Sequence, residues 1–122
     1  MQELEILFYD RPDGTEPVKD FLDSLNVKMR AKMLRTILLL AENGTQLREP
    51  YSKPLDEGIF ELRAKVGTDI SRVLYFFVVG KQVILTNGFV KKTQKTPTAE
   101  IEKAKRYRKE YLSRKDNQHD EV

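Results

Sequence analysis

Three strand-like segments follow one another between residues 59 and 90, and only a few residues separate each from the next. The segments read IFELRAKV (59–66), ISRVLYFFVV (70–79) and QVILTNGFV (82–90). Connections this short join neighbouring strands as antiparallel hairpins. The centre of the chain therefore predicts a three-stranded antiparallel meander, against which the remaining segments must pack.

The part of the chain before the meander predicts one more strand and a pair of helices. Residues 2–9 alternate between apolar and acidic side chains, which is typical of a half-buried strand. Pro17 opens a short helix with one apolar stripe, because proline favours the first helical position. Asn26 is a suitable N-cap for a second helix over residues 27–42, which ends at Asn43-Gly44. These helices predict a hairpin packed on the sheet.

The remaining segments complete an α+β fold with a small antiparallel sheet, an N-terminal helical hairpin and a C-terminal helix. Residues 44–58 hold two prolines and two glycines without a clear period, so a loop is predicted there. Thr96-Pro97 starts the final helix, with the threonine capping it from just outside. The predicted order is β-α-α-β-β-β-α in a single domain of residues 1–115. Residues 116–122 are polar and predict a mobile tail.

Composition excludes several classes of site. The 122 residues include no cysteine, and the one histidine, His119, lies in the polar tail. A disulfide framework, a thiolate metal site and a Ser/His/Asp triad are therefore not expected, and neither a metal nor another cofactor is predicted. The N-terminus is acidic and no run of 18 apolar residues occurs, so we expect a cytoplasmic protein with no membrane segment.

Charge is distributed unevenly along the chain. The net charge is only +3, but residues 1–25 carry seven acidic and two basic side chains, whereas residues 89–115 carry three acidic and ten basic ones. A C-terminal region this basic fits binding to an anionic polymer. The alternative is that the lysine-rich final helix only presents a solvated face.

Two arginines lie inside apolar strand patterns, and a lysine cluster follows the last strand. A charged side chain within a strand is costly unless it is paired or binds an anion. The arrangement therefore predicts a phosphate-binding surface made by Arg63, Arg72, Lys91, Lys92 and Lys95.

Strand register decides whether the two arginines act together. If residues 66–69 form the first turn, Arg63 lies opposite Arg72 on one face of the sheet. A two-residue turn at Gly80-Lys81 then sets Arg72 beside Phe89. Two directly opposed arginines destabilise a hairpin unless an anion or an acid lies between them. This register therefore predicts either a bound anion or Glu61 as their partner.

Other interpretations stay open from the residues alone. A three-residue loop at 67–69 would separate the two arginines. Arg63 could pair with Glu61 or with an exposed acid at a sheet edge and have no functional role. Phe89 could belong to the core, and the lysine cluster could be a solvated turn before the final helix.

The same residues resemble a known family. GIFELR (58–63), SRVLYFF (71–77) and GFVKKTQKTPTAEIEKA (88–104) are similar to segments of the RelE/ParE superfamily of bacterial toxins, and most of all to its HigB-like, phage-derived branch. The resemblance covers almost the whole chain and has the same order of elements. It implies a type II toxin that cleaves mRNA on the ribosome and is neutralised by a protein antitoxin, expected to be a HigA-like helix-turn-helix protein.

The resemblance also implies roles for individual residues. By position, Arg72 matches the arginine that holds the scissile phosphate, Arg63 matches a basic residue on the preceding strand, and Lys91 and Lys92 occupy the place of another basic group. The sequence departs from some members at Glu61, where those members have a lysine.

The expected chemistry is metal-independent RNA cleavage, in which the ribose 2′-OH attacks the adjacent phosphorus and leaves a cyclic phosphate. Arginine suits the stabilisation of phosphorane charge but cannot act as a base, so Glu61 or a lysine would accept the proton. Phe89 is expected to stack on a base. Further RNA contacts are predicted for Lys95, Lys105 and Arg108.

Two other functions are compatible with the sequence. A ParE-like toxin disables DNA gyrase by binding it, and in such a protein Arg63 and Arg72 would be structural, so that their loss would unfold the chain. The third possibility is an RNA-binding module without catalytic activity or toxicity.

Overall fold

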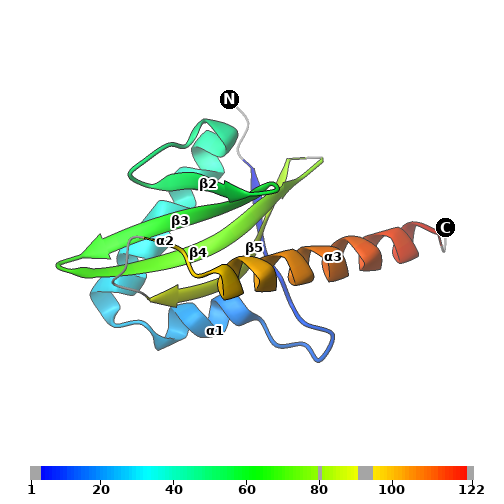
Figure 1. Cartoon of the computed structure of the whole chain (residues 1–122), viewed down its shortest axis with the longest axis horizontal. Helices are drawn as coiled ribbons and strands as arrows, with labels where there is room; N and C mark the ends of the chain where they lie inside the picture. The colour runs from blue at the N-terminus through cyan, green and yellow to red at the C-terminus, as the bar shows by residue number, and fades with distance from the viewer. Residues whose placement is uncertain (1–3, 80, 91–94, 121–122) are drawn as a thin grey trace.

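The chain folds as a five-stranded sheet with helices on both faces (Figure 1). The computed structural model describes residues 4–79, 81–90 and 95–120. The strands lie in the order β1-β5-β4-β3-β2. Because β1 (Glu5–Phe8) runs parallel to β5 (Gln82–Val90) while the other neighbours are antiparallel, the sheet is mixed. The predicted α+β class is confirmed, but the sheet is not purely antiparallel.

Two helices precede the meander, as predicted. Helix α1 (Pro17–Ser24) has proline at its start, and α2 (Val27–Asn43) follows after a short connection. The Asn26 side chain accepts a hydrogen bond from the Met29 backbone N–H at 2.9 Å, which confirms the N-cap. Gly44 ends α2 at a φ of 55°, a conformation that glycine adopts without strain, and a short 3₁₀ turn, η1 (Gly44–Gln46), follows.

The helices lie on opposite faces of the sheet, with α1 and α2 on one face and α3 (Thr98–Asp120) on the other (Figure 1). The first layer buries the apolar stripes of α1 and α2 against the sheet residues Leu62, Ala64, Val73, Tyr75, Val83 and Leu85. The second and smaller layer places Ala104 of α3 with Tyr9, Ile59, Leu74, Phe76 and Ile84. The sheet is therefore buried on both faces, and α3 covers the face that carries Arg72.

Strand β3 (Ile59–Val66) and β4 (Asp69–Val78) have the predicted register, with Arg63 opposite Arg72. Arg72 also lies beside Phe89 of β5, as predicted, although the residue pairing of β4 with β5 near their turn differs from the prediction. Val78 rather than Val79 pairs with Gln82, which shifts the pairing by one residue. A bulge at Thr86 shifts it back, since Leu74 pairs with Asn87 while Tyr75 pairs with Leu85.

The predicted loop at residues 44–58 is wrong in part, because it contains the edge strand β2 (Ser52–Asp56), antiparallel to β3. Glu57 and Gly58 form the connecting turn with φ values of 47° and 81°, as a two-residue hairpin of the I′ type requires. Pro54 argued against a strand in the sequence, but an edge strand tolerates proline because one side makes no ladder hydrogen bonds. The observed order is therefore β-α-α-β-β-β-β-α.

The final helix is longer than predicted. Helix α3 continues to Asp120, so at least residues 116–120 of the expected tail are helical, and Figure 1 shows this end projecting beyond the sheet. Local hydrogen bonds suffice to extend a helix once it has formed.

Tyr9, next to β1, binds α3 through its side chain. The Tyr9 hydroxyl donates to Glu110 Oε1 at 2.8 Å. Burial and this hydrogen bond raise the pKa of Tyr9 to about 12, so the hydroxyl stays protonated and keeps donating.

The ring of Phe21 from α1 packs directly against Gly88 of β5, and we predict that Gly88→Ala destabilises the protein. A Cβ atom at this position would lie 2.3 Å from Cδ2 of Phe21. We expect the free energy of unfolding to fall by about 1–3 kcal/mol in urea titrations, because the ring must move out of its packing. In a Phe21→Ala background the same substitution should cost much less, and an equal cost in both backgrounds would contradict this account.

Candidate functional site

Three charged side chains from β3 and β4 meet on the sheet face that α3 covers. Glu61 and Arg63 share that face because they are two residues apart on β3, and Arg72 lies directly opposite Arg63. Arg63 Nε lies 2.6 Å from Glu61 Oε2, and Arg72 Nε lies 3.9 Å from the same oxygen. The prediction that the two arginines share a face is confirmed. Of the two predicted partners, a bound anion or Glu61, the structure shows Glu61.

These three residues, Glu61, Arg63 and Arg72, differ in burial, and we name them the Glu61 cluster. The side chains of Glu61 and Arg72 are completely buried, whereas 20% of the Arg63 side chain is exposed. Burial lowers the pKa of Arg72, and the negative charge of Glu61 opposes that shift. The guanidinium still remains charged at neutral pH because arginine loses its proton only far above that range. In this conformation Arg63 is therefore the arginine that reaches the surface.

Thr96 connects this cluster to the start of α3. Its hydroxyl donates a hydrogen bond to Glu61 Oε1, and only 4% of the residue is exposed. The sequence predicted that the Thr96 side chain caps the final helix, but the side chain bonds to Glu61 of β3 instead. Both carboxylate oxygens of Glu61 thus accept bonds, one from Arg63 and one from Thr96. The start of α3 is fixed relative to β3 by this contact.

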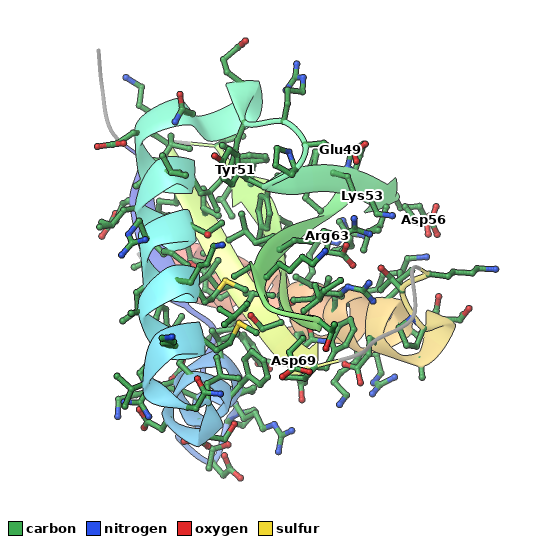
Figure 2. All side chains as sticks on the ribbon, turned by 90° about the vertical axis from the view of Figure 1, so that its left-hand side faces the viewer. Glu49, Tyr51, Lys53, Asp56, Arg63 and Asp69 are labelled. Atoms are coloured by element: carbon green, nitrogen blue, oxygen red, sulfur yellow. The ribbon has the colours of Figure 1, made fainter. Side chains whose placement is uncertain are left out.

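A fourth charged residue, Lys53, is absent from the sites predicted by sequence. It lies on β2 opposite Glu61, so its side chain is on the same face as the arginines. Figure 2 shows Lys53 and Arg63 on neighbouring strands of this sheet edge. The sequence gives no role to Lys53 because residues 44–58 are predicted as a loop. The available signal was Gly58, which follows the segment SKPLD and precedes an apolar strand as a hairpin turn does.

A hollow of about 250 Å³ lies between β2 and the start of α3. Two lysines, Lys53 and Lys95, line it, and the buried Thr96 contributes to its wall. The other lining residues are Pro54, Leu55 and Ile101. We name this the β2/α3 hollow. It combines positive charge with an apolar wall beside the Glu61 cluster, an arrangement suited to an anion attached to a less polar group.

The remaining residues of the predicted phosphate surface have separate outcomes. Lys91 and Lys92 lie outside the described residues. Lys95 is exposed at the β2/α3 hollow. Phe89 is half-buried and packs against the core layer beneath α3, as the core interpretation expected.

The two basic residues predicted on the final helix face the β2–β3 turn. Lys105 Nζ lies 2.7 Å from Asp56 Oδ2 and 2.6 Å from Glu57 Oε2. Arg108 Nη1 donates to the Glu57 backbone carbonyl. Side-chain hydrogen bonds to Asp56 and Glu57 raise the pKa of Lys105, so it keeps its positive charge. Both residues thus hold α3 against the hairpin in this structure.

Two further kinds of feature are absent from the part of the chain that the structure describes. Among these residues, no group of three or more histidine, aspartate or glutamate side chains is arranged to hold a metal ion. No helix in the described ranges combines the length and apolar character needed to cross a membrane.

The buried ion pair yields a stability prediction. Arg72→Ala should lower the free energy of unfolding by about 3 kcal/mol or more, because it opens a buried volume and leaves the buried Glu61 carboxylate with the partly exposed Arg63 as its one ionic partner among the described residues. Arg63→Ala should cost less, since that side chain reaches solvent and Arg72 stays beside the Glu61 carboxylate. Urea unfolding monitored by circular dichroism measures both.

The matched variant is Glu61→Gln combined with Arg72→Met, which removes both buried charges and keeps similar volumes. We expect it to be more stable than Arg72→Ala alone, because methionine fills the volume that alanine leaves empty and no buried carboxylate has lost its buried partner. Arg72→Ala at the stability of the parent would show that the pair does not support the fold.

Comparison with known proteins identifies the family. No curated protein matches the chain significantly. The family model of phage-derived Gp49-like proteins (DUF891) matches residues 20–109, which include most of α1, all of α2, four strands and the first half of α3. This match covers most of the chain and all of the Glu61 cluster. The chain therefore belongs to the phage-derived Gp49-like family, a RelE-like family of toxin-like proteins in toxin–antitoxin systems.

Proposed function

We propose that this protein is the toxin of a type II toxin–antitoxin pair, of the HigB-like branch, and that it cleaves mRNA on the ribosome. Membership of a toxin-like family supports the first part. The second part rests on one observation: Arg63 is held by Glu61 at the surface, on the same sheet face as Lys53 and beside the β2/α3 hollow. Several cations at one sheet edge fit a nucleotide linkage.

The proposed reaction uses the nucleophile that RNA carries. The ribose 2′-oxygen bonds to the adjacent phosphorus as the bond from phosphorus to the 5′-oxygen breaks, which leaves a 2′,3′-cyclic phosphate. The 2′-OH loses its proton to a base, and the departing 5′-oxygen gains one. Arg63, Lys53 and Lys95 would stabilise the negative charge on the phosphorane, and that stabilisation is the largest contribution such a site offers.

The buried residues take positioning roles in this proposal. Glu61 already accepts hydrogen bonds at both oxygens, so it is poorly arranged to take a proton from the ribose. Its role is to orient the Arg63 guanidinium. The buried Arg72 holds the Glu61 carboxylate in place. It would therefore affect the phosphate indirectly, through the orientation of Glu61 and Arg63. The proton acceptor is then a lysine of this surface or a group that the ribosome supplies.

The ribosome and a protein antitoxin are the expected partners. A site with few catalytic groups depends on a correctly held substrate, and the ribosomal decoding site would hold the mRNA in place. We expect free RNA to be cut poorly. The antitoxin, proposed to be HigA-like, would mask or distort the cationic surface in the cytoplasm.

The nuclease proposal is tested with purified protein on translating ribosomes. Arg63→Ala should lower the cleavage rate by about 10²–10³, the effect of losing one group that stabilises transition-state charge. Lys53→Ala should lower it less. Primer extension locates and quantifies the cuts, and mRNA with a 2′-deoxy residue at the cut position should remain intact there.

Lys19→Ala is the matched control, because Lys19 is an exposed lysine on α1 in a surface ion pair with Asp23. It should cleave like the parent. Intact transcripts with the parent protein would exclude the nuclease activity, whereas equal cleavage by Arg63→Ala of verified fold would exclude the assigned role.

A second candidate is a ParE-like toxin that inhibits DNA gyrase without cleaving nucleic acid. The complete burial of Arg72 and Glu61 favours it, because in such a protein the cluster is structural. Gyrase supercoiling assays distinguish the two candidates. Inhibition by the parent and by Arg63→Ala alike, with no mRNA cleavage, would support this alternative.

A further inference from the structure

A second cavity lies at the same sheet edge, on the side of α2. Its volume is about 270 Å³, and the lining residues come from α2, from the segment before β2, and from β3 and β4. Four of them carry the chemistry: Lys32, Tyr51, Arg63 and Lys65. We name this the Tyr51 cavity. Since Arg63 also belongs to the Glu61 cluster, the cavity adjoins the proposed cleavage site.

Three cations line the Tyr51 cavity, and among the described residues only Arg63 has an acidic partner, Glu61. Lys32 and Lys65 are exposed, and neither forms an ion pair with any residue that the structure describes. No acidic side chain is among the described residues that line the cavity. The contrast is Lys105, which three carboxylates surround. The lysines of the Tyr51 cavity can therefore bind an anion without breaking an internal pair.

Tyr51 supplies an aromatic surface beside these cations. The residue is 43% exposed, and its backbone is anchored to β3 because its carbonyl accepts a hydrogen bond from the Arg63 N–H at 2.8 Å. Figure 2 shows Tyr51 at the β2–β3 edge near α2. An exposed aromatic ring next to several cations is the combination that binds single-stranded nucleic acid, with a base on the ring and the phosphate on the cations.

We propose that the Tyr51 cavity binds one nucleotide of single-stranded RNA, adjacent to the nucleotide held at the cleavage site. The proposal rests on the function proposed above and extends the RNA path from the β2/α3 hollow, across Arg63, to α2. An acidic segment of a protein partner would use the lysines equally well. The exposed ring and the shared Arg63 favour RNA, because a nucleotide brings both a flat base and a phosphate.

The direct test measures binding of a fluorescent 2′-O-methyl RNA hexanucleotide, which cannot be cut by 2′-OH attack. Tyr51→Ala should weaken binding about tenfold or more, and Tyr51→Phe should bind like the parent because the ring remains. Lys32→Ala and Lys65→Ala should each weaken binding and reduce the slope of log K against log salt by about 0.7. Lys28→Ala changes an exposed lysine of α2 outside the cavity and should have no effect.

The outcomes separate this proposal from the nuclease proposal. If the parent does not cut mRNA on ribosomes but the hexanucleotide result holds, the cavity binds RNA and the cleavage mechanism is wrong. Should Tyr51→Ala and both lysine variants bind the hexanucleotide like the parent, the RNA subsite is wrong even if cleavage is observed. Unchanged RNA binding together with weakened association of the antitoxin would assign the cavity to a protein partner and overturn the proposal.

Discussion

The carboxylate of Glu61, buried between two arginines, is the interaction on which the functional half of the structure depends. A pair of arginines facing each other across a hairpin repels, and Glu61 converts that repulsion into attraction. Through Thr96 the same carboxylate also fixes the start of α3. One side chain thus links three elements of the fold. Its loss would disturb the pairing of β3 with β4 and the placement of α3 together.

This arrangement separates the cations by accessibility. Arg72 is buried, and Lys105 forms ion pairs with Asp56 and Glu57 at the β2–β3 turn. Lys53 and Lys95 line the β2/α3 hollow, whereas Lys32, Arg63 and Lys65 line the Tyr51 cavity at the same edge. Cations therefore also gather at the β2–β3 edge, most of them outside the C-terminal third that the sequence marks as basic. Family membership indicates a toxin-like protein, and this edge is where we propose that RNA binds.

The meander was predictable because its signals are local. Alternating apolar strands and short turns fix a register, and that register is enough to put Glu61, Arg63 and Arg72 on one face of the sheet. Phe89 lies beside Arg72 as predicted, but the predicted pairing near the turn was wrong. Gln82 pairs with Val78 and not with Val79, and the bulge at Thr86 corrects this one-residue shift. Edge strand β2 escaped prediction because Pro54 is tolerated there only when one side of the strand stays outside the sheet, which no local pattern reports.

By itself, the sequence determined the helices, the meander and the shared face of the two arginines, because hydrophobic period, capping residues and turn chemistry act over a few positions. Tertiary structure alone decided which charges are buried and which are exposed. That outcome depends on β2 pairing with β3, on α3 lying over Arg72, and on Thr96 turning toward Glu61 instead of capping its own helix. Burial is a property of how distant segments pack, so the ligand-facing cations emerge only when the sheet is assembled.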